Sequence, residues 1–395
     1  MVADVAQQYA VGVIEATNRA NLQIRGIGKS QTTLIERLIG AGLGSSTVGG
    51  DDVRNVMLSP AAGIDRQLLC DTRPLAEQIL LTLQEQEHFH ELSPKFAVQL
   101  DGGEALAMLE HPHDLWLSAM EREGELLFAF GLAGSPLDLP AGSVRAQHGH
   151  ALVIAVLELF LEWAGPDQTR MRHLLAECSL DAFVTRLAER VPLMPVSDWH
   201  RGIVPAALHI GAHPQQEAGR VYVGAVPPLG RLDAAMLRGA AQLAHEWGSG
   251  SLRFTPWQSL LVPDVHVDDA DEVIHLLEKS GLHCSFEPAL VHLVACAGST
   301  GCGKGLADTK ADARQLAALL PQDGHAPKVH LSGCPRSCAA AHVAPITLLA
   351  VGPGRYDLYF RDARASGFGA LHTPNLTIEA AAALLDARSR SALDA

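Results

Sequence analysis

Four cysteines near the C-terminal end of the chain have the spacing of a metal-binding site. Cys296 and Cys302 form a C-x5-C pair, and Cys334 and Cys338 form a C-x3-C pair further along the chain. Four thiolates are the ligand set of an iron–sulfur cluster and also of a structural zinc ion. The sequence therefore predicts that these four side chains bind a metal centre.

Each pair follows a segment that is typical of a β-strand. The first pair follows Leu290–Ala295, the second follows Lys328–Leu331, and a segment typical of a helix comes after each pair. Two strands that end side by side would bring the four sulfurs together in the loops that follow them. The glycines of the first loop, Gly298, Gly301 and Gly303, would let the backbone approach a cluster closely and donate N–H groups to sulfur.

Three other interpretations of this region stay open. The run Gly298-x4-Gly303-Lys304 approaches a phosphate-binding P-loop, but Gly305 stands where that loop needs Ser or Thr for magnesium. Zinc sites usually have cysteine spacings tighter than C-x5-C. Four buried core cysteines are the third alternative, although Gly and Pro flank both pairs, as is typical of surface loops. The spacing favours the iron–sulfur cluster.

The composition is that of an ordinary folded protein. Of 395 residues, 48% are apolar and 19% are charged, and the formal net charge of −14 argues against nucleic acid as the main partner. The cysteine usage favours a reducing cytoplasm, with Cys70, Cys178 and Cys284 as small apolar side chains. Met1–Ala10 lacks the features of a signal peptide, and the apolar segment Ala151–Trp163 is too short to span a membrane. We expect a cytoplasmic protein with no membrane partner, in which Ala151–Trp163 is a buried helix.

Local signals place two helices in the first half of the chain. Thr33 and Glu36 predict a capping box before a helix over Leu34–Ala41, which Gly42 would end. A second helix is predicted over Pro74–Glu85, because proline is favoured in the first turn of a helix.

The order of the predicted elements repeats along the chain. Thr17 corresponds to Thr255 and Gly42 corresponds to Gly281, each followed by the same kinds of segment. We infer an internal duplication of α/β units. The first copy has no counterpart of the predicted strand Val221–Val226, which suggests that its beginning is truncated or mis-started.

The cysteine pairs occur only in the second copy. In the first copy, Met57 and Asp101 lie near the positions that the sulfurs would take. A duplication in which one copy holds the metal predicts a site between the two halves.

These motifs resemble those of the sulfite/nitrite reductase superfamily, whose members hold a [4Fe–4S] cluster with such cysteines beside a siroheme. The resemblance implies an α+β fold, pseudo-twofold and duplicated, with two ferredoxin-like half domains and two mixed α/β domains. The implied boundaries are 1–45 for a truncated ferredoxin-like half domain, 46–200 for an α/β domain without a cluster, 201–285 for the second half domain and 286–395 for the cluster-binding α/β domain.

The resemblance also suggests which residues contact a tetrapyrrole. TNRANLQ is similar to the family's T-x-R-x-x-x-Q strand, which places Arg19 and Gln23 at the tetrapyrrole. RNV, with Arg54 and Asn55, is similar to a second anion-contacting element, and SPKF places Lys95 at the active face. Arginine and lysine suit the carboxylates of such a molecule. The second half adds Gln258, Lys304 and Arg336 as candidates, while Arg25 and Lys310 are equally well interpreted as solvated surface charges.

One departure from the family pattern favours a particular branch. Siroheme reductases have K-F-K, whereas this chain has Lys95-Phe96-Ala97. With the stretches TPWQSLLVP and SPAAGID, the chain looks most like the precorrin-3B synthase branch. That resemblance implies an O2-dependent monooxygenase that converts precorrin-3A to precorrin-3B, by C-20 hydroxylation and γ-lactone formation, in aerobic cobalamin biosynthesis.

The synthase branch implies a [4Fe–4S] cluster, a mononuclear non-heme iron, a tetrapyrrole substrate and an external electron donor. The sequence does not identify ligands for that iron. The alternative is a siroheme-dependent sulfite or nitrite reductase.

Overall fold

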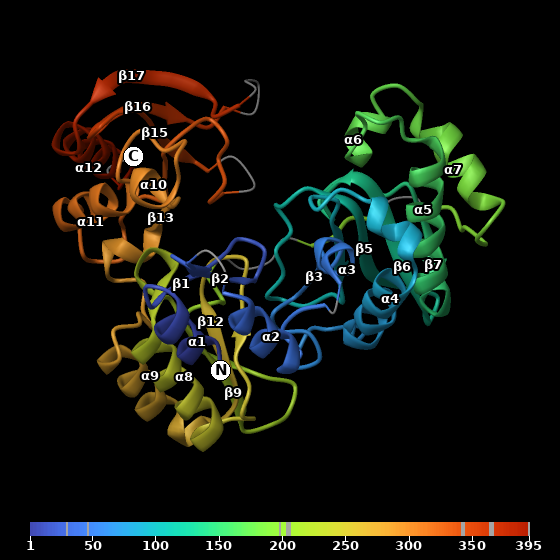
Figure 1. Cartoon of the computed structure of the whole chain (residues 1–395), viewed down its shortest axis with the longest axis horizontal. Helices are drawn as coiled ribbons and strands as arrows, with labels where there is room; N and C mark the ends of the chain where they lie inside the picture. Colours follow the sequence, from blue (N-terminus) through green and yellow to red (C-terminus); the bar gives the residue numbers. More distant parts are fainter. Residues whose placement is uncertain are drawn as a thin grey trace. The chain divides into compact units, whose positions relative to one another are not determined.

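The apolar runs of the chain form four β-sheets within the residues that the computed structural model describes (Figure 1). These residues are 1–28, 31–45, 47–196, 199–202, 207–340, 344–362 and 367–393. The chain divides into two compact units. Unit 1 contains Met1, Gln31–Leu208 and Pro214–Ala218, and unit 2 contains Val2–Ser30, His209–His213 and Gly219–Ala395. The division into four domains stays a prediction.

Unit 1 is built on a five-stranded sheet in the order β3-β4-β5-β6-β7. The first three strands run parallel to one another, and β6 and β7 are antiparallel to their neighbours. The strands are β3 (Val56–Leu58), β4 (Val98–Asp101), β5 (His113–Arg122), β6 (Glu125–Gly134) and β7 (Gly142–Arg145). The helices are α2 (Thr32–Gly40), α3 (Val48–Asp52), α4 (Arg73–Glu85), α5 (Gly149–Trp163), α6 (Met171–Leu174) and α7 (Leu180–Ala188).

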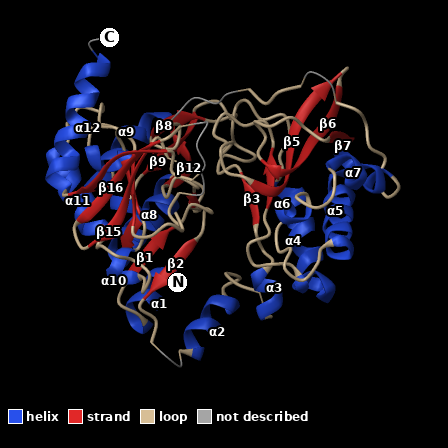
Figure 2. Cartoon of the chain, turned by 90° about the horizontal axis from the view of Figure 1, so that it is seen from above, coloured by secondary structure: helices blue, strands red, loops and turns tan. Residues whose placement is uncertain are grey.

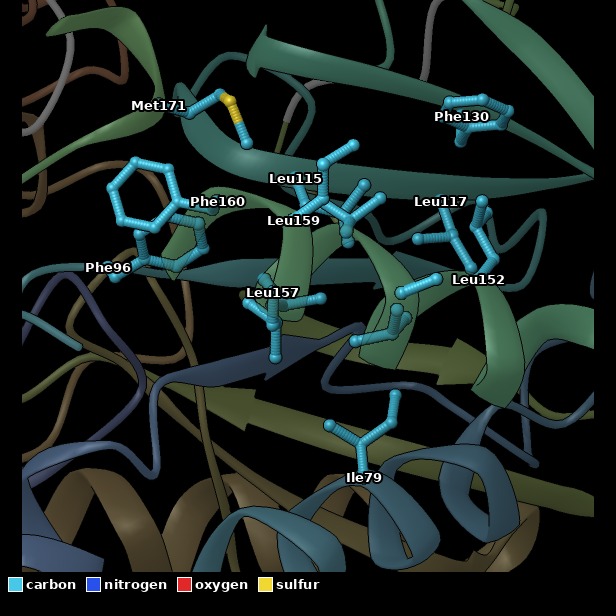
Figure 3. Packing of buried hydrophobic residues seen from close by; sticks show 14 of the residues in the cluster. Ile79, Phe96, Leu115, Leu117, Phe130, Leu152, Leu157, Leu159, Phe160 and Met171 are labelled. Carbon is cyan, nitrogen blue, oxygen red and sulfur yellow. The ribbon is translucent and has the colours of Figure 1, made fainter. Parts of the chain in front are cut away.

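The core of unit 1 lies between this sheet and helices α4 and α5 (Figure 2). Figure 3 shows Ile79 of α4 and Leu152 and Phe160 of α5 packing with Leu115 and Leu117 of β5. Helix α5 is the apolar segment that the sequence predicted to be buried, and that prediction is confirmed. None of the described helices is long and apolar enough to cross a membrane.

Unit 2 contains a five-stranded sheet with the same architecture. Its order is β13-β14-β15-β16-β17, with β13, β14 and β15 parallel and the last two strands antiparallel. The strands are β13 (Leu293–Ala295), β14 (Val329–Ser332), β15 (Ile346–Gly352), β16 (Arg355–Phe360) and β17 (Ala370–Leu376). The helices of this part are α10 (Gly298–Gly301), α11 (Thr309–Leu319) and α12 (Ile378–Leu393). Two sheets with one order and one pattern of directions confirm the predicted duplication.

The rest of unit 2 contains two smaller antiparallel sheets, β10-β1-β2 and β11-β12-β9-β8. Their strands are β1 (Val13–Ala16), β2 (Leu22–Arg25), β8 (Gly211–Pro214), β9 (Arg220–Ala225), β10 (Arg231–Asp233), β11 (Arg253–Phe254) and β12 (Leu260–His266). Helices α1 (Val2–Tyr9), α8 (Ala234–Trp247) and α9 (Ala270–Lys279) pack with them. Strand β10, from the second copy, pairs with β1, so the first hairpin does not expose both of its edges.

The duplication reaches the hairpin turns that follow Thr17 and Thr255. Thr17 N–H donates to Asn21 O, and Thr255 N–H donates to Ser259 O, at 2.9 Å in both cases. In each turn the threonine hydroxyl also accepts backbone N–H groups from two and four residues ahead. The correspondence between these two threonines is therefore confirmed at the level of hydrogen bonds.

One local prediction is wrong. The predicted capping box of Thr33 and Glu36 does not form, because α2 begins at Thr32 and Gln31 occupies the N-cap without a side-chain hydrogen bond. The helix predicted after Cys338 falls largely on residues 341–343, which lie outside the described residues. By contrast, Gly42 follows the end of α2 with φ +72°, as its role as a stop requires.

Candidate metal centre

The four cysteines lie in two loops at one edge of the unit 2 sheet. Cys296 follows β13 directly, and Cys302 is the residue after α10. Cys334 and Cys338 lie in the loop that follows β14. Because β13 and β14 are parallel and adjacent, their carboxyl ends meet at the same edge of the sheet. The predicted convergence of the two strand ends is confirmed.

The electrostatics of Cys338 show that the four sulfurs are neighbours. Burial raises the pKa of the Cys338 thiol, and the negative charges of Cys334, Cys296 and Cys302 raise it further, while Arg336 opposes them. All four side chains are free thiols, with Cys302 and Cys338 exposed and the other two half-buried. Cationic groups or metal ions would relieve this repulsion between thiolates.

Cys296 has the most extensive set of contacts among the four. Gly333 N–H donates to Cys296 Sγ at 3.1 Å, and the hydroxyl of Thr309 lies 3.6 Å from the same sulfur. A Cβ atom on Gly333 would lie 3.3 Å from Cys296 Sγ and 3.2 Å from the Cα of Gly305. The close approach of the two loops therefore depends on glycine at position 333.

The packing of Gly305 argues against the P-loop interpretation. A Cβ atom on this residue would lie 2.5 Å from the carbonyl carbon of Gly298. No side chain fits there, so the serine or threonine that a P-loop needs for magnesium could not take this position.

The arrangement of the thiols suits a cluster better than a single ion. Among the described residues, no three His, Cys, Asp or Glu side chains are placed to hold one metal ion together. A zinc site needs four ligands around one ion at about 2.3 Å for sulfur, whereas each iron of a [4Fe–4S] cluster takes its own cysteine. Four neighbouring thiols with one N–H donor to sulfur fit the second case.

Two hairpin turns of unit 2 reach the loop that contains Cys338. The Asn18 side chain donates to Cys338 O at 3.3 Å, and the Gln258 side chain donates to Ala339 O at 3.2 Å. Gln258 is 8% exposed, so its amide is committed to the cysteine loop in this structure. Its predicted contact with a tetrapyrrole stays a prediction.

The other candidates of unit 2 are exposed. Gln23 lies on β2, but Arg19 lies in the turn before it, not on the strand that the similarity to the family's T-x-R-x-x-x-Q pattern implied. Lys304 lies in the first cysteine loop, and Arg336 lies between the two cysteines of the second loop. Exposed cations beside the cysteine loops can meet an acidic ligand, and these four assignments stay predictions.

The candidates of unit 1 belong to two segments that contact each other. The Asn55 side chain donates to Pro94 O at 3.0 Å, which brings the RNV and SPKF segments together. Arg54 pairs with Asp51 at 3.2 Å and is partly exposed, and Lys95 is exposed. Their assignment to the active face likewise stays a prediction.

Sequence reasoning missed a buried charged network beneath the cysteine loops. Glu15 of β1 is 5% exposed and pairs with Arg25 at 2.7 Å and Arg231 at 2.8 Å. Lys310 is 3% exposed and lies 3.8 Å from Glu15, so the interpretation of Lys310 as a solvated surface charge is wrong. The Arg25 side chain is 37% exposed, so it is partly solvated as well as paired. The available signal was the charged Glu15 inside the otherwise apolar run Val13–Ala16.

Comparisons with known proteins identify the family. Residues 49–193 match the nitrite and sulphite reductase 4Fe-4S domain, and residues 213–280 match the nitrite/sulfite reductase ferredoxin-like half domain. The ferredoxin–nitrite reductase of Synechococcus elongatus is 32% identical over 85% of this chain and 70% of its own length. The chain belongs to the nitrite and sulphite reductase family. The chloroplastic ferredoxin–nitrite reductase of Zea mays is 31% identical over 87% of the chain, which spans 65% of the length of that enzyme.

The fold comparison agrees with the family. The NirA protein of Mycobacterium tuberculosis superposes with a TM-score of 0.78 at 20% identity, over 98% of this chain and 77% of NirA. The predicted fold class is confirmed. The match to the 4Fe-4S domain covers residues 49–193 of unit 1, where no C-x5-C or C-x3-C pair occurs. The assignment of the cluster therefore depends on the cysteines of unit 2. The precorrin-3B synthase branch receives no support from these relatives, whose printed names are those of nitrite reductases.

Proposed function

We propose that this chain is a reductase of nitrite or sulfite that carries a [4Fe–4S] cluster and a siroheme. The observation that carries the proposal is the set of four cysteines at one sheet edge, in a family whose relatives here are named ferredoxin–nitrite reductases. A ferredoxin-like one-electron donor is the partner that this proposal implies. When bound, the cluster and siroheme supply one-electron transfer to the substrate.

The residues of the chain hold and orient these groups. Cys296, Cys302, Cys334 and Cys338 bind the cluster, and Asn18 and Gln258 fix the backbone of the last cysteine's loop. The exposed Arg19 provides a guanidinium for the carboxylates that fringe a tetrapyrrole. Arg54 and Lys95 provide positive charge for the substrate anion, because exposed cations attract small oxoanions and stabilise the charge on them.

A second candidate function is precorrin-3B synthase, which one specific observation favours. Ala97, where the family's reductases have a second lysine, is half-buried and donates its N–H to Asp114 at 2.9 Å. The SPKF segment therefore offers one cation, Lys95, to a small anion. The loss of the second cation weakens the site for a small anion, whereas a carboxylate of a large tetrapyrrole substrate can still pair with Lys95.

Absorption spectroscopy of the purified full chain separates the two functions. If the chain is the reductase, we expect its spectrum to show a Soret band and red bands from siroheme. If it is the synthase, we expect only broad absorbance at about 400 nm from the cluster. An anaerobic assay with reduced viologen then measures nitrite and sulfite consumption. A protein with a full cluster, no bound tetrapyrrole and no consumption of either anion would contradict the reductase and leave the synthase.

The ligand assignment has its own test. We expect Cys338→Ser to lose the cluster, because a hydroxyl is a much poorer ligand for iron than a thiolate. Cys178→Ser is the matched control, since Cys178 is a half-buried thiol of unit 1 and should leave iron and acid-labile sulfide unchanged. Full iron and sulfide in Cys338→Ser would show that the assignment is wrong.

A further inference from the structure

We propose that the buried cation Lys310, which pairs with Glu15, raises the reduction potential of the cluster. This inference rests on the proposed function, because it needs a cluster bound by Cys296. The four charged residues are Glu15, Arg25, Arg231 and Lys310, and all of them belong to unit 2.

Lys310 lies directly beneath the first cysteine. It is the second residue of α11, the helix that follows the first cysteine loop, and only 3% of it is exposed. Its ammonium donates to Ala295 O at 3.1 Å and to Leu229 O at 2.8 Å. Ala295 immediately precedes Cys296, so these hydrogen bonds hold a cation beside the backbone of a cluster ligand. The electrostatic interaction of Lys310 with Cys296 confirms that the two groups are near each other.

Glu15 pairs with three cations. Glu15 is the only carboxylate among the four residues. It forms ion pairs with Arg25, Arg231 and Lys310, which belong to three different elements. Asp308 and Asp312 near the start of α11 are also negatively charged; Asp312 accepts a hydrogen bond from the Tyr356 hydroxyl at 2.5 Å and Asp308 caps the helix. Lys310 is the buried cation of the network, whereas 37% of the Arg25 side chain and 29% of the Arg231 side chain are exposed to water, which weakens the effect of their charges.

The protonation states support this count. Burial favours the neutral form of Glu15, but Lys310, Arg231 and Arg25 together hold the pKa of this carboxyl below its usual range. Burial lowers the pKa of Lys310 to about 8, against the attraction of Glu15. At pH 7 Lys310 is therefore mostly charged, and its charge is present when the cluster is reduced.

A fixed cation favours the more negative state of a neighbouring redox group. Reduction transfers one electron from the donor to the cluster, and no bond forms or breaks in the protein. The donor loses that electron, and the cluster becomes more negative by one charge. Net charge and hydrogen bonding near the sulfurs are known to set the potentials of such clusters. Lys310 therefore makes the cluster easier to reduce by the donor.

The test measures the midpoint potential of the cluster in the full holoprotein by redox titration followed by electron paramagnetic resonance. It is run at pH 6, because Glu15 raises the pKa of Lys310 and the ammonium must stay protonated when Glu15 is replaced. Lys310→Met removes the cation with little change in side-chain volume, and Glu15→Gln removes the opposing charge. Lys310→Arg keeps the charge. Arg314→Met is the matched control, because Arg314 is an exposed cation one turn further along α11.

We expect opposite shifts from the two charge changes. Lys310→Met should lower the reduced-to-oxidised ratio at a fixed ambient potential by about tenfold or more, which is about 59 mV for one electron. Glu15→Gln should raise the ratio, while Lys310→Arg and Arg314→Met should change it much less. If Lys310 had only a structural role, Glu15→Gln would not shift the potential in the opposite direction to Lys310→Met. If Lys310→Met does not retain iron, Glu15→Gln decides alone, because it keeps Lys310 and must raise the potential.

Iron and acid-labile sulfide in the wild-type protein are measured first. A wild-type protein without iron and acid-labile sulfide would refute the proposed cluster and, with it, this inference. A full cluster whose potential is unchanged in both Lys310→Met and Glu15→Gln, or shifted the same way by both, would overturn this inference alone.

Discussion

The buried carboxyl of Glu104 should make the stability of unit 1 depend on pH. Glu104 is 0% exposed and accepts the Gly102 N–H at 2.7 Å through Oε2, while its Oε1 has no hydrogen-bond partner among the described residues. The neighbouring Asp101 pairs with Arg201 at 2.6 Å. Burial raises the pKa of Glu104 to about 8, and the charges of Asp101 and Asp65 add to this effect. Glu104 is therefore neutral over most of the physiological range.

The sign of the effect follows from the direction of the shift. The folded state holds the Glu104 proton more tightly than the unfolded chain, in which the pKa is near 4.5. The contribution to stability is fully present below that value and is lost as the pH rises towards 8. Each unit of pKa difference corresponds to about 1.4 kcal/mol. The free energy of unfolding of unit 1 should therefore fall by roughly 4 kcal/mol across this window.

Glu104→Gln removes the titration and keeps an oxygen for the Gly102 N–H. We would follow urea unfolding at several pH values between 5 and 8, with hydrogen exchange of β4 and β5 to assign the transition to unit 1. The variant should lose much less stability than the wild type as the pH rises. Glu77→Gln, an exposed change on α4, serves as the control and should keep the wild-type slope. Equal slopes for the wild type and Glu104→Gln would refute the reasoning.

Two further predictions concern the cluster and a buried ion pair. Removing the cluster by oxidation and chelation should increase hydrogen exchange in the loops after β13 and β14, because these loops contain its proposed ligands. Exchange in the loops after β3 and β4 should stay unchanged. Equal increases in both pairs of loops would contradict the ligand assignment. Asp114→Asn should lower the free energy of unfolding by about 3–5 kcal/mol in urea titrations, because it leaves Arg170, 2.8 Å away, without a buried counter-charge. Glu189→Gln, in an exposed pair with Arg186, should cost less than about 1 kcal/mol, and an equal loss in both variants would contradict the role of burial.

The sequence was most informative where local chemistry determines the structure. Pro74 marks the first turn of α4, and Gly42 takes the positive φ that follows α2. The two strands before the cysteine pairs form because apolar runs between loop residues are typical of buried strands. These signals act over a few residues, so tertiary contacts rarely override them.

Pairings between distant residues could not be predicted in the same way. Glu15 and Lys310 are far apart in the chain, and nothing in their local sequence shows that both are buried. Gln258 was expected to contact a tetrapyrrole, whereas tertiary packing places its amide within hydrogen-bonding distance of Ala339 O. Thr33 and Glu36 satisfy the capping pattern, yet the helix begins one residue earlier and Gln31 takes the N-cap. A short motif does not specify which of two adjacent residues starts a helix.

The register of the two sheets shows which residues of unit 1 correspond to the cysteines of unit 2. Strands β3 and β4 pair as Val56↔Val98, and β13 and β14 pair as Leu293↔Val329. Counting from these pairs, Ser59 takes the place of Cys296 and Gly103 takes the place of Cys334. The sulfur positions are therefore two residues beyond Met57 and Asp101, which the sequence had suggested.

In the first copy, hydrogen bonds within the protein occupy this edge of the sheet. Ser59 donates to Leu106 O at 2.6 Å, and Leu106 N–H donates to Asp65 at 3.2 Å. Arg201 joins Asp101 to the backbone carbonyl of Glu104. These contacts join the loops of unit 1 to one another, and they surround Glu104, whose carboxyl has a raised pKa. In the second copy the corresponding loops are glycine-rich and carry two exposed thiols. At this sheet edge, the loops of unit 1 are thus joined by hydrogen bonds within the protein. The corresponding loops of unit 2 carry the four thiols that we propose as ligands of the cluster.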